Sequence, residues 1–213
     1  GGGKVTVTGG TISGIDMMFG GNLTLGSNNG SVSTTTPIIT KSNEYGTGVR
    51  MGSTGGTFNF YDGQITGTIE KGAIYDGSFN NATTVTNIPS GYSIAYSIDS
   101  TAGTETATLR TTSSIEAEVS ATGETTRKFV EIEDAFEYVN AKTLTSPTIK
   151  VLKAVTNPTT LTLNSGKTAT LNTNGYTISK SSSSYLITNK GTLTITGSGT
   201  LSNTAYRCVY NNG

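Results

Sequence analysis

The stretch that decides the fold is residues 185–213, which read YLITNKGTLTITGSGTLSNTAYRCVYNNG. Leu and Ile occupy alternate positions in its middle, and Thr, Ser, Gly and Asn fill most of the others. Alternation with a period of two is typical of a strand with one buried face, and Gly and Asn suit the turns between strands. The stretch therefore indicates short strands joined by tight turns.

The same stretch repeats itself every 22 residues. Three pairs of residues share this offset: Ile187 and Val209, Asn189 and Asn211, and Gly191 and Gly213. Related segments occur elsewhere in the chain: KVTVTGGTISG at 4–14, TFNFYDGQITG at 57–67 and, with one inserted residue, TLTITGSGTLSN at 192–203. Each unit would supply three short strands, which is the size of one coil of a parallel β-helix.

The repeat predicts an all-β chain built as a parallel β-helix, a solenoid whose coils stack on one another. A β-sandwich with Gly-rich hairpins is the alternative fold. In the solenoid, Leu193 and Ile195 should point into a shared apolar column, while Thr192, Thr194 and Thr196 should face solvent. Asn189 and Asn211 should stack as a side-chain ladder.

The middle of the chain departs from the repeat. SIAYSI and TETATL around the turn DSTAG predict one β-hairpin, and SSIEAEVSATGETTRKFV predicts a second. EIEDAFEYVNA places Ile132, Ala135, Phe136 and Val139 on one face of a short helix. Because an open solenoid end exposes strand edges, we expect this helix to cover one.

Three segments follow from this interpretation. Residues 1–90 would be the end of a first β-helix, 91–128 a closing hairpin and junction, and 129–213 the helix-capped start of a second β-helix. VYNNG ends at the phase where GGGKVTV begins, as one period of a longer tandem array would.

Composition argues against several classes of function. Only 13% of the 213 residues are charged, the net charge is zero, and no block of like charges occurs, so we expect no nucleic-acid partner. No long apolar run predicts membrane insertion. The lack of His excludes His-dependent nucleophiles and His-ligated metals in this chain, and we predict no metal and no cofactor. The lone Cys208 is expected to be a small buried hydrophobe, a reactive thiol being the alternative.

The segment that runs from FVEIEDAFEYVN through TIKVLKAVTNPTTLTLNSGKTATLNTNGYTIS to GTLTITGSGTLSN resembles the right-handed parallel β-helix repeats of adhesin-like cell-surface proteins of Gram-positive gut bacteria. GGTFNFYDGQITG followed by IPSGY resembles the closing element of the same proteins. One departure is Tyr176, where that family often has His after NG. The resemblance implies a secreted, cell-surface location, although no targeting or anchoring signal is found in the sequence.

Many right-handed β-helices are polysaccharide lyases or glycoside hydrolases, which need paired carboxylates. The five Asp residues here, Asp16, Asp62, Asp76, Asp99 and Asp134, are isolated in the sequence, and the turn YDGQ accounts for Asp62. We therefore predict no catalytic residues and no enzyme activity in this chain.

Binding has more support from the residues. Four tyrosines, Tyr61, Tyr75, Tyr92 and Tyr96, could stack on sugar rings, or could instead pack on the first hairpin and plug the coil. The leading hypothesis is an adhesin-like or stalk module whose partners are glycans, host surface proteins and neighbouring repeats of the same chain. The alternatives are a fragment of a carbohydrate-active β-helix enzyme and a purely structural repeat.

Overall fold

The chain folds mostly into short strands. The computed structural model describes residues 3–17, 21–51, 56–75, 85 and 87–213. Within them lie 22 strands, one α-helix, α1 (Ile132–Ala141), and one 3-10 helix, η1 (Thr112–Ser114). The predicted all-β class is confirmed, and the helix lies where the sequence predicts it. The chain divides into two compact units, Gly1–Ser113 and Ser114–Gly213.

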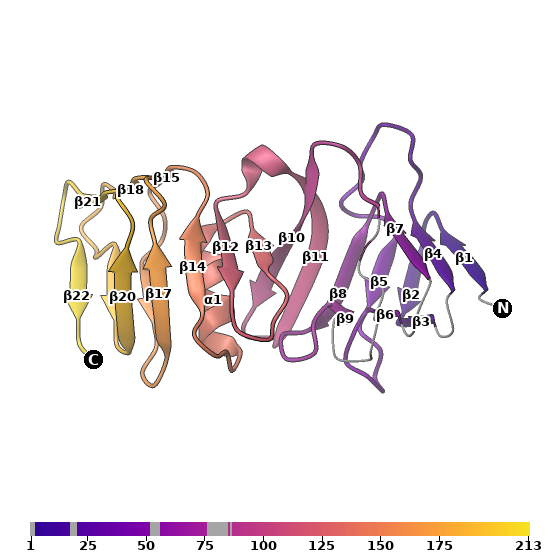
Figure 1. Cartoon of the computed structure of the whole chain (residues 1–213), viewed down its shortest axis with the longest axis horizontal. Helices are drawn as coiled ribbons and strands as arrows, with labels where there is room; N and C mark the ends of the chain where they lie inside the picture. Colours follow the sequence, from indigo (N-terminus) through magenta and orange to yellow (C-terminus); the bar gives the residue numbers. More distant parts are fainter. Residues whose placement is uncertain (1–2, 18–20, 52–55, 76–84, 86) are drawn as a thin grey trace. The chain divides into compact units, whose positions relative to one another are not determined.

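In the first unit, nine short strands recur in sets of three. They are β1 (Lys4–Val7), β2 (Thr11–Ser13), β3 (Ile15–Met17), β4 (Asn22–Leu25), β5 (Ile38–Thr40), β6 (Val49–Met51), β7 (Thr57–Phe60), β8 (Gln64–Thr68) and β9 (Ile74–Tyr75). Every third strand is a parallel neighbour, which gives the orders β1-β4-β7, β2-β5-β8 and β3-β6-β9. We call each set of three consecutive strands a rung (Figure 1).

The rungs of this unit stack in register although their loops differ in length. Val5 pairs with Leu23 and Leu23 with Phe58, so equivalent residues lie above one another. Leu23, Phe58 and Phe60 are fully buried. The related segments 4–14 and 57–67 are therefore two rungs apart. The rung between them, β4 to β6, escapes the sequence comparison because a long loop separates β4 from β5.

A hairpin closes one side of this unit. β10 (Tyr92–Asp99) and β11 (Thr104–Thr111) pair antiparallel, as predicted, and β11 also pairs antiparallel with β8, with Ala107 opposite Ile65. Ala107 and Ile65 are fully buried. The hairpin therefore occupies the backbone edge that β8 would otherwise expose.

The second unit begins with the second predicted hairpin, β12 (Ala117–Ser120) and β13 (Arg127–Phe129). Three rungs follow the helix. Their strands are β14 (Thr148–Val151), β15 (Val155–Thr156), β16 (Leu161–Leu163), β17 (Thr168–Asn172), β18 (Ile178–Lys180), β19 (Ile187–Asn189), β20 (Thr192–Thr196), β21 (Leu201–Asn203) and β22 (Val209–Asn211). Again every third strand is a parallel neighbour.

The predicted offset of 22 residues holds in this unit. Ile187 pairs with Val209 and Asn189 with Asn211. The Asn189 side chain donates a hydrogen bond of 2.7 Å from Nδ2 to Oδ1 of Asn211. The predicted asparagine ladder is thus confirmed.

Helix α1 and the second hairpin cover the first rung of this unit. The predicted apolar face of α1 is buried, and Tyr138 joins it. From the helix, Asn140 donates to the carbonyl of Thr162 at 2.8 Å and accepts from the amide of Asn164 at 2.9 Å, which satisfies the edge of β16. β12 pairs antiparallel with β14. The prediction that the helix covers a strand edge is confirmed.

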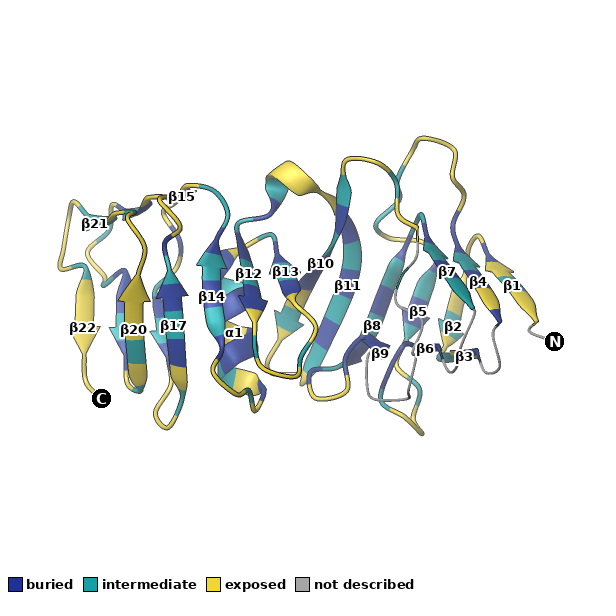
Figure 2. Ribbon diagram, viewed as in Figure 1, coloured by how far each residue is buried: buried dark blue, intermediate teal, exposed yellow. Residues whose placement is uncertain are grey.

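The last rung, β20 to β22, is not covered by the described residues. Ile195 is 44% exposed and Leu193 is half-buried, so the prediction that both lie within a buried column is wrong. The alternation itself is correct, because Ile195 pairs with Leu171, which is fully buried one rung earlier. Figure 2 shows the change from buried β17 to exposed β20 and β22.

Candidate functional site

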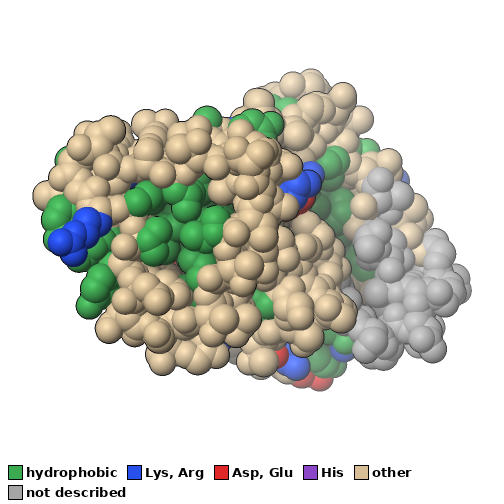
Figure 3. Space-filling model, turned by 60° about the vertical axis from the view of Figure 1, so that its left-hand side comes forward, with side chains coloured by type: hydrophobic (Ala, Val, Ile, Leu, Met, Phe, Trp, Pro, Cys, Tyr) green, Lys and Arg blue, Asp and Glu red, His purple; other side chains and the backbone are tan. Residues whose placement is uncertain are grey.

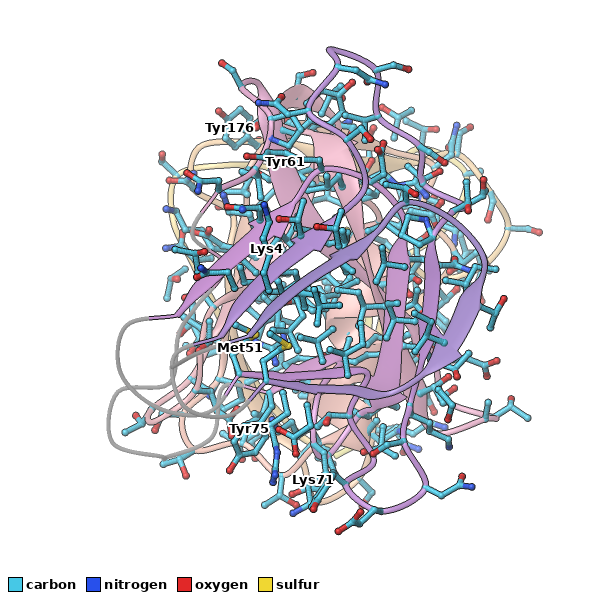
Figure 4. The ribbon with its side chains drawn as sticks, turned by 90° about the vertical axis from the view of Figure 1, so that its right-hand side faces the viewer. Lys4, Met51, Tyr61, Lys71, Tyr75 and Tyr176 are labelled. Atoms are coloured by element: carbon cyan, nitrogen blue, oxygen red, sulfur yellow. The ribbon has the colours of Figure 1, made fainter. Side chains whose placement is uncertain are left out.

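The four predicted tyrosines do not form one site. Tyr96 is only 8% exposed, and Tyr61, Tyr75 and Tyr92 are half-buried. Tyr61 follows β7 and Tyr75 ends β9, and Figure 4 shows these two on opposite sides of the first unit. Their role in binding stays a prediction, but a ligand stacked on Tyr61 would not also reach Tyr75.

A hollow that the sequence does not predict lies beside β3 and β6. The parallel register of these strands places Asp16 directly next to Arg50. The turn between β5 and β6 brings Tyr45 to the same place, since Ser42 accepts from the amide of Tyr45 at 3.0 Å and its carbonyl accepts from the amide of Gly46. The cavity measures about 100 Å³. It is lined by Ser13, Gly14, Ile15, Asp16, Ser42, Glu44, Tyr45, Thr47 and Arg50.

Arg50 is the centre of this hollow. Its Nη2 and Nε both donate to Oδ2 of Asp16, at 2.5 and 3.2 Å. Its guanidinium carbon lies 3.9 Å from the centre of the Tyr45 ring, which is a cation–π contact. The side chains of Arg50 and Asp16 are 14% and 33% exposed. These two contacts hold the guanidinium in one orientation while solvent still reaches it.

The electrostatics of the hollow are mildly acidic. The hydrogen bond to Asp16 raises the pKa of Arg50, which stays charged at any physiological pH. A hydrogen bond with Glu44 raises the pKa of Tyr45, so its hydroxyl keeps its proton. Asp16, Glu44 and Arg50 are the charged residues of the lining, and they carry one net negative charge.

This arrangement provides an aromatic ring, a fixed guanidinium, two carboxylates and the hydroxyls of Ser13, Ser42 and Thr47 around a small hollow. Such groups can hydrogen-bond a polyhydroxylated ligand and pack against its C–H face. The sequence gives no signal for it, because Asp16 and Arg50 are 34 residues apart and the recognisable repeat is 22 residues long. The two fall side by side only through the longer rungs of the first unit.

A second group of aromatic side chains lies in the last two rungs of the second unit. The Tyr185 ring packs against Tyr206 edge to face and against Tyr210 in a stack, both at 4.9 Å between ring centres. Tyr206 and Tyr210 are 45% and 41% exposed. The three rings use one another's faces, which leaves less free aromatic surface than their exposure suggests.

Two other residues differ from expectation. Asp62 does more than form a turn: its carboxylate accepts from the amides of Ser27 and Ser33, at 2.8 and 2.7 Å, and so anchors the long loop after β4. Cys208 is half-buried rather than buried, since it lies next to β22 in the uncovered rung, and burial raises the pKa of its thiol. Asp76 lies outside the described residues.

Within the described part of the chain, no group of three or more Cys, Asp or Glu is placed to hold a metal ion. The described helices include none long and apolar enough to cross a membrane. Comparison with protein-family models, with curated proteins and with solved structures finds no match to this chain.

Proposed function

We propose that the chain is a non-catalytic module of a cell-surface, adhesin-like or stalk protein, built from right-handed parallel β-helices, and that it binds a neutral glycan in the Asp16–Tyr45–Arg50 hollow. The rungs support the β-helix, because in both units every third strand pairs in parallel. β-Sandwiches are built from antiparallel strands, so this pairing counts against the alternative fold.

The observation that carries the binding proposal is the convergence of Asp16, Tyr45 and Arg50 from two strands and a turn. Arg50 is bound to Asp16 and lies over Tyr45, so its orientation is set before any ligand arrives. Pre-ordered polar groups reduce the entropy lost on binding. At about 100 Å³ the hollow is smaller than the usual drug-sized pocket, which fits one sugar residue at the end or side of a chain.

The charge of the hollow favours neutral sugars. Asp16 already neutralises Arg50, and Glu44 adds a second carboxylate to the lining. A uronic or sialic acid would bring its carboxylate close to that of Glu44, and like charges at this distance repel. Neutral hexoses and their oligosaccharides meet no such penalty.

The test is a titration of the purified 213-residue chain with neutral and acidic oligosaccharides, followed by calorimetry or by saturation-transfer NMR. We expect binding to neutral sugars and weaker or no binding to uronic-acid oligomers. Tyr45→Ala should weaken binding by at least about tenfold, because the ring supplies the apolar contact.

Tyr176→Ala is the matched control, since Tyr176 is 39% exposed and Tyr45 is 37% exposed, but Tyr176 lies in the second unit away from the hollow. It should leave the affinity unchanged. Equal losses in the two variants, or binding that survives Tyr45→Ala, would assign recognition to another surface. No binding to any neutral sugar would leave the chain with a structural role alone.

A further inference from the structure

The first rung of the first unit and the last rung of the second unit both present unpaired strand edges. β1, β2 and β3 pair only with β4, β5 and β6, and β20, β21 and β22 pair only with β17, β18 and β19, among the described residues. Each rung therefore exposes a row of backbone amides and carbonyls along three strands. Such edges favour the addition of further strands.

The exposed edges carry apolar side chains as well. In the last rung, Ile195 and Val209 are 44% and 41% exposed, and Leu193 and Leu201 are half-buried. Figure 3 turns this end of the chain toward the viewer and shows hydrophobic side chains gathered on its surface. In the first rung, Val5, Ile12 and Ile15 are half-buried. Both surfaces are apolar at the centre and lined by strand edges.

These two edges differ from the others in the same units. β11 occupies the edge of β8, β12 occupies the edge of β14, and Asn140 of α1 satisfies the edge of β16. The chain thus covers edges of the last rung in one unit and of the first rung in the other. The rungs β1–β3 and β20–β22 have no such cover among the described residues.

We propose that the last rung of one copy binds the first rung of a second copy, so that copies join head to tail by the same parallel strand pairing that stacks rungs within the chain. The segments match: Lys4–Val7 has the alternation of β20, with Val5 and Val7 in the places of Leu193 and Ile195. Ile12 of β2 likewise corresponds to Leu201 of β21.

Two observations make this pairing compatible with the rest of the structure. Rungs of unequal length already stack within the chain, since Asn22 pairs with Lys4 on one side and with Thr57, 35 residues later, on the other. The strands of the last rung contain no charged residue, so Lys4 and Asp16 of the first rung would meet no like charge there. The two surfaces are different, so the contact does not close on itself and should extend into linear oligomers.

The test uses the 213-residue chain under reducing conditions, which exclude disulfides through Cys208. Sedimentation velocity over about 1 to 500 µM should show concentration-dependent oligomers. Ile195→Lys, in the last rung, and Val5→Lys, in the first, should each abolish association, because either places an ammonium group in the apolar contact. The expected loss of affinity is at least about a hundredfold.

A mixture of the two variants is the decisive experiment. Each variant keeps one intact edge, so an equimolar mixture should form 1:1 dimers and nothing larger. If the last rung instead pairs with itself, Val5→Lys alone would dimerise and the mixture would give no mixed dimer, which would overturn the proposal. A wild-type chain that stays monomeric over the whole range would overturn it as well.

Thr194→Lys and Thr6→Lys are the matched controls. Both residues are exposed on the same two strands and face outward, so association should persist. Thermal unfolding checks that every variant is folded, and Val209→Lys with Ile15→Lys provides a second complementary pair should Val5→Lys unfold. The inference is independent of glycan binding, because none of the substituted residues except Ile15 lines the Asp16–Tyr45–Arg50 hollow.

Discussion

The first and last rungs of the second unit have similar sequences and different surroundings. Ile149 in β14 and Leu171 in β17 are fully buried, whereas Ile195 in β20, the next residue of the same column, is 44% exposed. Helix α1 and β12 cover the first rung, and no described residue covers the last. Alternation therefore determines the direction of a side chain, and the neighbouring rung determines whether it is buried.

The largest expected effect contrasts equivalent positions in a covered and an uncovered rung. Leu171→Asp places an unpaired carboxylate between two rungs and should destabilise the fold by about 3–5 kcal/mol. Ile195→Asp changes a partly exposed side chain and should cost less than about 1 kcal/mol in the monomer. Urea denaturation at low protein concentration measures both. Equal losses would mean that a partner covers the last rung even in the dilute chain.

A smaller effect is expected from the cover of the first rung. Asn140→Ala removes the donor to Thr162 and the acceptor from Asn164, so a backbone carbonyl and amide lose their partners. The loss of stability should be about 1–3 kcal/mol. Glu137→Ala, at an exposed position of the same helix, should change it by no more than about 0.5 kcal/mol. A silent Asn140→Ala would show that the helix contributes packing but no edge protection.

The asparagine ladder offers a contrast within one column. Asn189 is 7% exposed and bonds both Asn211 and the backbone of Gly191, so Asn189→Ala should cost about 1–2 kcal/mol. Asn211 is exposed, and Asn211→Ala should cost about 0.5 kcal/mol. Chemical denaturation of the two variants ranks them. The reverse order would contradict the assignment of Asn189 to the interior of the stack.

The smallest effect is a dependence on pH at the covered end. Burial by itself lowers the pKa of Lys142, which follows α1, but its hydrogen bond of 2.7 Å to Glu124 raises it, and the net pKa is raised. A cation with a raised folded pKa stabilises the fold fully below its unfolded pKa, near 10.5, and loses that contribution as pH rises through the folded value. Stability should therefore fall slightly above about pH 10.5.

Glu124→Gln should remove most of this loss, because the hydrogen bond to a carboxylate is its source. Unfolding midpoints measured between about pH 9 and 11.5 compare the two proteins. A wild-type chain that gains stability relative to Glu124→Gln over this range would contradict the raised pKa.

Local pattern in the sequence predicts much of the second unit. The apolar face of α1, the two hairpins and the contact between Asn189 and Asn211 follow from spacing that survives from one rung to the next. The first unit is harder, because its loops change length and no single offset relates its rungs. For that reason the rung β4–β6 and the pairing of Asp16 with Arg50 are not visible in the sequence.

The exposure of Ile195 is a different failure. Its neighbours in the sequence indicate an inward direction, which is correct, but burial depends on a strand that would have to follow β20 in space. The candidate site shows the same limit, since Tyr45 reaches Arg50 through a turn whose shape depends on contacts of Ser42 rather than on a repeat.

The central claim is that strands one rung apart pair in parallel and in register, and an engineered disulfide tests it most directly. Thr170 pairs with Thr194, and adjacent strands lie about 4.8 Å apart, within the range that a disulfide can span. In a Cys208→Ser background, Thr170→Cys with Thr194→Cys should oxidise readily within the monomer, whereas Thr168→Cys with Thr194→Cys, two residues out of register, should not. Failure of the first pair, or equal oxidation of both, would contradict the stacked rungs.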